Sequence, residues 1–159
     1  MKYLLDTNAC IAVINGQPER VRLRLAEEVE AKAELAVSSI VLYELWYGVA
    51  KSSRAEANSR RLSAFLGGPI SLLPFDDEDA RIAGTLRASL ESEGRPIGAY
   101  DLLIAGQAFR RNLTLVTANV TEFRRVRGLV WQDWAKSRQG PARGEWGPSA
   151  GSRPRLRVQ

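Results

Sequence analysis

Short apolar runs alternate with longer stretches of helical periodicity along residues 1–134, which predicts strands alternating with helices. Strands are expected at residues 2–5, 35–38, 70–73, 113–116 and 129–131. Helices are expected from a cap at residues 6–8 to Gly16 and over residues 18–32, 39–50, 54–66, 76–93 and 99–111. Strands separated by helices pair in parallel, so the pattern indicates a parallel sheet covered on both faces.

Individual residues mark where several of these helices begin. Pro18 suits the first turn of the helix over 18–32 because its φ is fixed near the helical value, and Ser39 can cap the next helix. The acidic run at residues 76–79 places negative charge at a helix start, where the macrodipole favours it, and is expected to be solvated. Solvated faces are also expected for the basic pairs Arg60-Arg61, Arg110-Arg111 and Arg124-Arg125.

Composition indicates one domain of a reduced compartment. The 159 residues suffice for a single core, and Cys10 is the only thiol, so no internal disulfide can form and Cys10 is expected to be a small core residue. No apolar run resembles a secretory signal or reaches membrane-spanning length. A cytoplasmic protein without membrane association is expected.

The positive charge belongs to the C-terminal tail. The chain has 23 basic and 18 acidic residues, of which residues 136–159 hold six basic and one acidic, so residues 1–135 carry 17 of each. The tail is rich in Gly, Pro, Ser and Arg and lacks apolar periodicity, which predicts disorder. The expected division is therefore a folded domain over 1–135 and a disordered tail over 136–159.

Three acidic residues interrupt apolar stretches: Asp6, Glu44 and Asp101. A carboxylate removed from water must be paired, protonated or bound to a cation. The chain contains no His and one Cys, which excludes Ser-His-Asp triads, histidine-based acid–base pairs and the usual zinc sites. Oxygen ligands on a hard cation remain, and Mg²⁺ is the leading candidate, with Mn²⁺ as the alternative.

The expected strands bring these acids toward one edge of the sheet. Asp6 follows the first strand, whereas Thr117 and Asn119 follow the strand at 113–116. In an open parallel sheet, ligands bind beyond the carboxyl ends of strands where the winding reverses. Glu44 lies in the helix after the second strand and Asp101 in the first turn of its own helix, so all can converge there.

Structural interpretations compete with this one. Asp6 and Asp101 are also well placed to cap or begin a helix, and Glu44 could pair with a basic side chain from elsewhere. Trp46 and Tyr47 are expected to be core or subunit-contact residues rather than base-stacking ones.

The order and spacing of several segments resemble the PIN-domain family and, within it, the VapC-type toxins of bacterial toxin–antitoxin pairs. The matching segments are residues 4–8 (LLDTN), 38–48 (SSIVLYELWYG), 73–76 (LPFD), 97–105 (IGAYDLLIA) and 115–123 (LVTANVTEF), with a similar close at 128–134 (GLVWQDW). Each alone is weak, but their order covers nearly all of residues 1–135.

The resemblance implies a three-layer α/β/α fold with a central parallel sheet of four to five strands. It implies a metal-dependent endoribonuclease with catalytic positions at Asp6, Glu44, Asp101 and Asn119, of which Asp6, Asp101 and Glu44 hold the metal. The wider family often has Asp where this chain has Asn119, so a site for a second metal would lack one negatively charged ligand. Glu122 is the substitute for that ligand.

Within this interpretation, the cation activates water and stabilises the leaving oxygen, while the hydroxyls of Thr7 and Thr117 orient the acids. The implied partners are folded RNA, with tRNA favoured, a VapB-like antitoxin protein and a second copy in a homodimer.

Two alternatives remain open. Asn119 favours a catalytically weak PIN-fold module that binds RNA or a partner. Asp6 after a first strand also fits an aspartyl-nucleophile phosphatase, although Asn8 stands where such enzymes usually have a second Asp.

Overall fold

The computed structural model describes residues 1–137 and 142–144, and within them a single sheet runs in the order β3-β2-β1-β4-β5-β6. Its strands are β1 (Lys2–Leu5), β2 (Glu34–Ser38), β3 (Ser71–Leu73), β4 (Thr114–Val116), β5 (Val130–Gln132) and β6 (Ala142–Arg143). The first five pair in parallel, and β6 pairs antiparallel with β5. The expected parallel sheet is confirmed, with one short antiparallel strand added at its edge.

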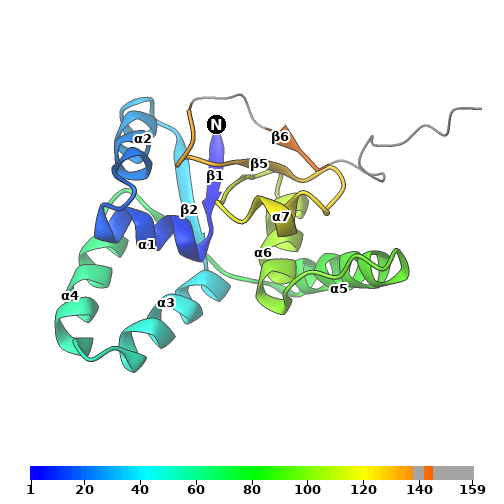
Figure 1. Ribbon diagram of the computed structural model, residues 1–159, viewed down its shortest axis with the longest axis horizontal. Coiled ribbons are helices and arrows are strands. Elements are labelled where there is room, and N and C mark those ends of the chain that lie inside the picture. The colour runs from blue at the N-terminus through cyan, green and yellow to red at the C-terminus, as the bar shows by residue number, and fades with distance from the viewer. Residues whose placement is uncertain (138–141, 145–159) are drawn as a thin grey trace, which may run out of the picture.

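Helices cover both faces of this sheet, which confirms the three-layer α/β/α class. They are α1 (Thr7–Asn15), α2 (Glu19–Glu30), α3 (Ser39–Lys51), α4 (Ala55–Leu66), α5 (Asp77–Ser92), α6 (Ala99–Arg110) and the short α7 (Val120–Phe123). α1 to α4 lie on one side of the strands and α5 to α7 on the other (Figure 1). None of the helices in the described part of the chain is long and apolar enough to cross a membrane.

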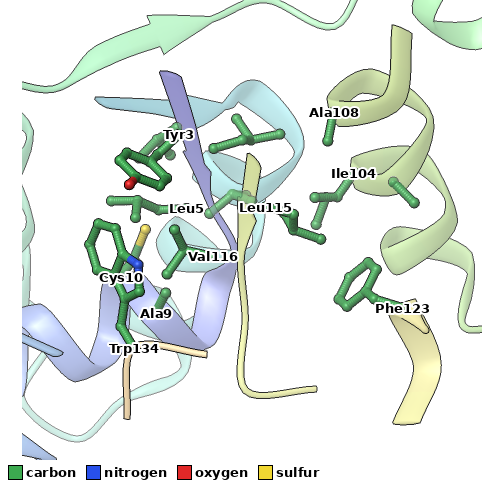
Figure 2. Close-up of a cluster of buried hydrophobic side chains, with 14 of the residues drawn as sticks. Tyr3, Leu5, Ala9, Cys10, Ile104, Ala108, Leu115, Val116, Phe123 and Trp134 are labelled. Atoms are coloured by element: carbon green, nitrogen blue, oxygen red, sulfur yellow. The ribbon is translucent and has the colours of Figure 1, made fainter. Parts of the chain in front are cut away.

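The register of β1 and β4 divides the core between the two faces. Leu4 is level with Leu115 and Leu5 with Val116, and all four side chains are buried. Because side chains alternate along a strand, Leu5 and Val116 point toward α1, whereas Leu115 points toward α6 (Figure 2). Cys10 is fully buried on the α1 side, which confirms its role as a small core residue.

The structure differs from the sequence-based expectations in the cap of α3 and in two short elements. The cap of α3 is Ser38 rather than Ser39, since the Ser38 hydroxyl accepts from the Ile40 amide at 3.1 Å. The Ser39 hydroxyl instead accepts from the Phe75 amide at 3.0 Å, which ties α3 to the segment after β3. Neither α7 nor β6 was expected, because a one-turn helix and a two-residue strand are too short to leave a periodic pattern.

The acidic run at 76–79 is not simply a solvated helix start, because Asp79 is fully buried. Asp76 and Asp79 form a reciprocal capping box at the start of α5. Asp79 Oδ1 accepts from Arg110 Nη1 at 2.7 Å, and Asp79 Oδ2 accepts from Arg111 Nη2 at 2.9 Å. Gln107 Nε2 also donates to Asp79 Oδ2, at 3.1 Å.

The expectation that Arg110 and Arg111 form a solvated face is therefore also wrong. Both guanidinium groups bridge Asp76 and Asp79 and keep less than a third of their side-chain surface exposed. The C-terminal end of α6 is thereby fastened to the N-terminal end of α5. The two helices also approach closely at Gly106, where a Cβ would lie 2.9 Å from the Cα of Ala83. These contacts fix the axis of α6, whose first turn contains Asp101.

Ordered backbone continues past the expected domain boundary at 135. Ala142 pairs with Trp131, and the Gly144 amide donates to the Leu129 carbonyl at 2.9 Å. The other part of the tail on which disorder was expected, 138–141 and 145–159, lies outside the described residues. Disorder of the tail stays a prediction for those positions.

We expect Asp79→Asn to lower the free energy of unfolding by about 2–4 kcal/mol at neutral pH, because it removes one partner of a buried ion pair. Burial alone would raise the pKa of Asp79, but the hydrogen bonds from Arg111, the Asp76 amide and Arg110 hold it well below its usual range. Because the pKa of Asp79 is lower in the folded state than the unfolded-state value of 3.8, its ionisation stabilises the fold fully above that value. This stabilisation is lost progressively as the pH falls from there toward the folded-state pKa.

Urea unfolding of wild type and Asp79→Asn at several pH values tests this. The stability difference should stay constant above about pH 5 and shrink below about pH 4. Asp77→Asn is the control, because Asp77 is exposed on the same helix turn and should change stability by less than about 0.5 kcal/mol. Equal effects of the two substitutions would contradict the structural role of Asp79.

Candidate active site

The chain changes its winding direction between β1 and β4, and the candidate site lies at their carboxyl ends. β2 and β3 follow on one side of this pair and β5 on the other. Asp6 immediately follows β1, and its amide donates to the Val116 carbonyl at 3.1 Å. Thr117 immediately follows β4, so the parallel register brings these two residues together at the position where open sheets bind ligands.

Asp6 caps α1 and at the same time faces the site. Its Oδ1 accepts from the Ala9 amide at 2.7 Å, and only 4% of the residue is exposed. Burial raises the pKa of Asp6 to about 6; hydrogen bonds from Thr117 and the Ala9 amide lower it, and the charges of Asp101 and Glu44 raise it further. The capping interpretation is thus correct but incomplete, because a cap alone would not bring two other acids within electrostatic range.

Glu44 reaches the site from the second turn of α3. Its Oε1 accepts from the Thr7 hydroxyl at 2.9 Å, and the side chain is partly buried. Thr7 is the first residue of α1, directly after Asp6. The hydroxyl of Thr7 therefore holds Glu44 beside Asp6, which is the orienting role predicted for it.

Asp101 and Asn119 form the opposite wall of the site. Asn119 Nδ2 donates to Asp101 Oδ2 at 3.0 Å, and the Asn119 amide donates to the Thr117 hydroxyl at 2.9 Å. Burial raises the pKa of Asp101, as do the charges of Glu122 and Glu44, whereas the Asn119 hydrogen bond lowers it. All the predicted site residues are thus linked by hydrogen bonds or by mutual electrostatic effects.

Glu122 belongs to this cluster as well. It lies on α7, and its Oε2 accepts from the Gly98 amide at 3.0 Å, just before α6 begins. Its charge reaches Asp101. The spacing of three residues from Asn119 suggested Glu122 as a substitute ligand, and the fold brings it close to Asp101 through the unexpected helix α7.

Oxygen atoms are the only donors that these residues offer, and such a set would suit a hard divalent cation. Its charged ligands are carboxylates, and Asn119 adds an amide oxygen that is not used in the bond to Asp101. Among the described residues, no three His, Cys, Asp or Glu side chains already converge as a metal-binding group. Burial is the main reason for the raised pKa values of Asp6 and Asp101, and a cation bound between them would offset the charge repulsion that adds to it.

The PIN domain family matches residues 3–129. A ribonuclease VapC2 of Rickettsia felis is 42% identical over 86% of this chain and 100% of its own length. The chain belongs to the PIN-domain family. It is a VapC-type member of that family of nucleases, and the resemblance inferred from the motifs is confirmed.

Other VapC proteins are similar over almost their full length. A tRNA(fMet)-specific endonuclease VapC of Shigella flexneri is 40% identical over 85% of this chain and 99% of the relative. The crystal structure of DNA-bound VapBC from Salmonella typhimurium matches with a TM-score of 0.77 at 39% identity, covering 84% of this chain and 98% of that one. The crystal structure of VapBC2 from Rickettsia felis bound to a promoter DNA fragment also matches with a TM-score of 0.77, at 39% identity.

Sequence reasoning missed the aromatic border of the site. Tyr43 and Tyr100 directly precede Glu44 and Asp101, and their rings contact each other. Trp46 is 39% exposed and Tyr47 58% exposed, so the core interpretation of these two residues is wrong. Two aromatic residues each next to a candidate acid were the available signal, but only the packing of α3 against α6 shows that they meet.

We expect Asp6→Asn to raise the melting temperature by about 5 °C at neutral pH in the presence of a chelator, because it removes one of several like charges from a buried site. Asn keeps the cap of α1, since Asn and Asp are equally good caps. Differential scanning calorimetry measures the change.

Addition of Mg²⁺ should then raise the melting temperature of wild type more than that of Asp6→Asn, because the variant has one ligand charge fewer. Asp77→Asn, which removes an exposed acid at the start of α5, is the control outside the site. The assignment of Asp6 would be contradicted if Asp6→Asn had a lower melting temperature than wild type in chelator. It would also be contradicted if Mg²⁺ raised the melting temperatures of the variant and of wild type equally.

Proposed function

We propose that this chain is a divalent-metal-dependent endoribonuclease that acts as the toxin of a toxin–antitoxin pair and cleaves folded RNA. The observation that supports this most strongly is that Asp6, Glu44 and Asp101, from three separate segments, lie within electrostatic range of one another near the β1–β4 switch point. Like charges that lie close together lower the stability of the free protein. Such arrangements are therefore found mainly where they bind a ligand. A hard cation and the phosphate it binds are the ligands that fit.

Asp6 and Asp101 hold the cation, and Glu44 supports it or orients the attacking water. When bound, a divalent cation polarises the scissile phosphate and lowers the pKa of water. Thr7 keeps Glu44 in place through its hydroxyl, and Thr117 does the same for Asp6. Asn119 keeps Asp101 oriented without adding a further negative charge. Mg²⁺ is the favoured ion and Mn²⁺ the alternative.

The names of the relatives support the proposed substrate class. The similar proteins of Rickettsia felis and Shigella flexneri are a ribonuclease and a tRNA(fMet)-specific endonuclease by name. We assign folded RNA to this chain, with a tRNA loop as the favoured target.

We expect Asp101→Asn to reduce RNA cleavage by at least about 100-fold, because even residues that only orient a metal ligand contribute 10–100-fold. Its fold should remain intact, since Asn119 can still hydrogen-bond the new amide. Cleavage of labelled tRNA with Mg²⁺ or with chelator, together with the melting temperature, measures both effects.

The control is Asp77→Asn, an exposed acid outside the site, which should cleave like wild type. Full activity of Asp101→Asn would show that the site is wrongly assigned. If wild type itself binds RNA but never cleaves it with any divalent cation, the alternative of a catalytically weak binding module, favoured by Asn119, would hold.

We further propose a VapB-like antitoxin as partner, since the similar structures from Rickettsia felis and Salmonella typhimurium are VapBC complexes. A groove of about 250 Å³ between α1, α3 and α4 fits an apolar segment of such a protein. Ile11, Leu45 and Val49 contribute to its lining, and so does Glu44 of the acidic site. A basic side chain of the partner could there pair with the acidic site. A homodimer also stays a prediction, supported by the exposed Trp46 on α3.

We expect Ile11→Asp to weaken the antitoxin complex by at least about tenfold, because it places a charge in an apolar contact. Titration calorimetry with the product of the adjacent antitoxin gene measures the affinity. Leu72→Asp is the control, since Leu72 is 52% exposed on β3, outside the groove. Equal affinities of wild type and Ile11→Asp would remove the groove from the interface.

A further inference from the structure

Three exposed tyrosines lie beside the acidic site. Tyr43, Tyr47 and Tyr100 expose 56%, 58% and 46% of their surface. Tyr43 and Tyr47 are four residues apart on α3 and therefore share one side of the helix. Tyr100 projects from the first turn of α6 and meets Tyr43, with ring centroids 5.7 Å apart and hydroxyl oxygens 3.4 Å apart.

A basic residue extends this stripe. Lys51 lies four residues beyond Tyr47 on the same side of α3, and its Nζ is 5.8 Å from the centre of the Tyr47 ring. Eight residues of helix from Tyr43 to Lys51 span about 12 Å. The surface therefore runs from neutral aromatic rings near the acids to a positive charge at its far end.

The tyrosines border the acids in space as well as in sequence. Tyr43 and Tyr100, whose ring centroids are 5.7 Å apart, directly precede Glu44 and Asp101. A polynucleotide whose phosphate binds at Asp6 and Asp101 would therefore come near the rings that directly precede Glu44 and Asp101.

The charge of the site explains why such rings would be needed. Apart from the phosphate that the cation binds, phosphates of RNA near the site are repelled by carboxylates that the cation does not neutralise, so the backbone contributes little affinity there. Stacking of a base on an aromatic ring requires no charge and stabilises binding of any base. It does require the base to be unpaired, because the faces of paired bases are covered by their neighbours.

We propose that Tyr43, Tyr47 and Tyr100 form a stacking platform for unpaired bases, and that Lys51 contacts the phosphate of the same strand. The platform orients a single-stranded or loop segment of RNA across the acidic site. This inference rests on the proposed function and names its substrate class more closely: a flexible, unpaired segment rather than a duplex.

The test measures binding, not cleavage, in an Asp101→Asn background. Fluorescence anisotropy is recorded with a short single-stranded RNA, with the same RNA carrying abasic sites, and with its duplex. We expect the abasic sites and the duplex each to bind at least about fivefold more weakly than the intact single strand.

Substitution of both Tyr43 and Tyr100 by Leu should weaken binding of the intact strand by about fivefold to tenfold per base and leave the abasic strand unaffected. Substitution of both by Phe should preserve affinity, because the ring and not the hydroxyl makes the contact. Phe109→Leu, an exposed aromatic at the other end of α6, is the matched control.

The proposal would be overturned if the double Leu variant bound the intact single strand as tightly as its parent. It would also be overturned if the double Phe variant lost as much RNA affinity as the double Leu variant. Light scattering is recorded on the same samples. If the Leu variant loses only self-association and keeps its RNA affinity, the surface is a subunit interface and the proposal fails. A wild type that binds unpaired RNA through these rings but never cleaves it would refute the proposed function alone.

Discussion

β1 and β4 lie side by side in parallel at the centre of the sheet, and every residue of the candidate site depends on that pairing. It places Asp6 next to Thr117 and sets the two strand ends from which α1 and the segment leading to α7 depart. Four strand residues on the two faces of this pair are fully or almost fully buried, so a shift of one residue would turn apolar side chains toward the wrong layer. The core thus fixes the register, and the register positions the carboxylates.

Two buried aspartates, Asp79 and Asp6, have opposite electrostatic environments. Asp79 is enclosed by Arg110, Arg111 and Gln107, and its pKa lies well below the usual range. Asp6 is almost as buried, but its charged neighbours are Asp101 and Glu44, and its pKa is raised to about 6. The first is a compensated charge that fastens α5 to α6. The second lies beside like charges, and burial together with these charges raises its pKa, a combination that clusters at functional sites.

The compensated charge of Asp79 also supports the acidic site. Asp101 lies at the start of α6, and the ion pairs with Asp79 and Asp76 hold the end of the same helix. Gly106 lets α6 approach Ala83 of α5 closely enough to leave the helix axis little freedom. Asp101, Tyr100 and the Gly98 amide that binds Glu122 are therefore presented from a rigid element, although none of them contacts the ion pairs directly.

The sequence by itself determined the order of β1 to β5 and of α1 to α6, the family, and which acids are candidates for the site. Alternating apolar runs and helical periodicity are local properties, and a lone acid in an apolar stretch can be read without knowing its neighbours. Only the tertiary structure decided which charges meet. Asp79 and Arg110 are 31 residues apart, Thr7 and Glu44 are 37 apart, and Tyr43 and Tyr100 are 57 apart. The sequence shows that such residues exist, but partner and burial depend on how helices pack across the sheet, and that packing is set by the whole core at once.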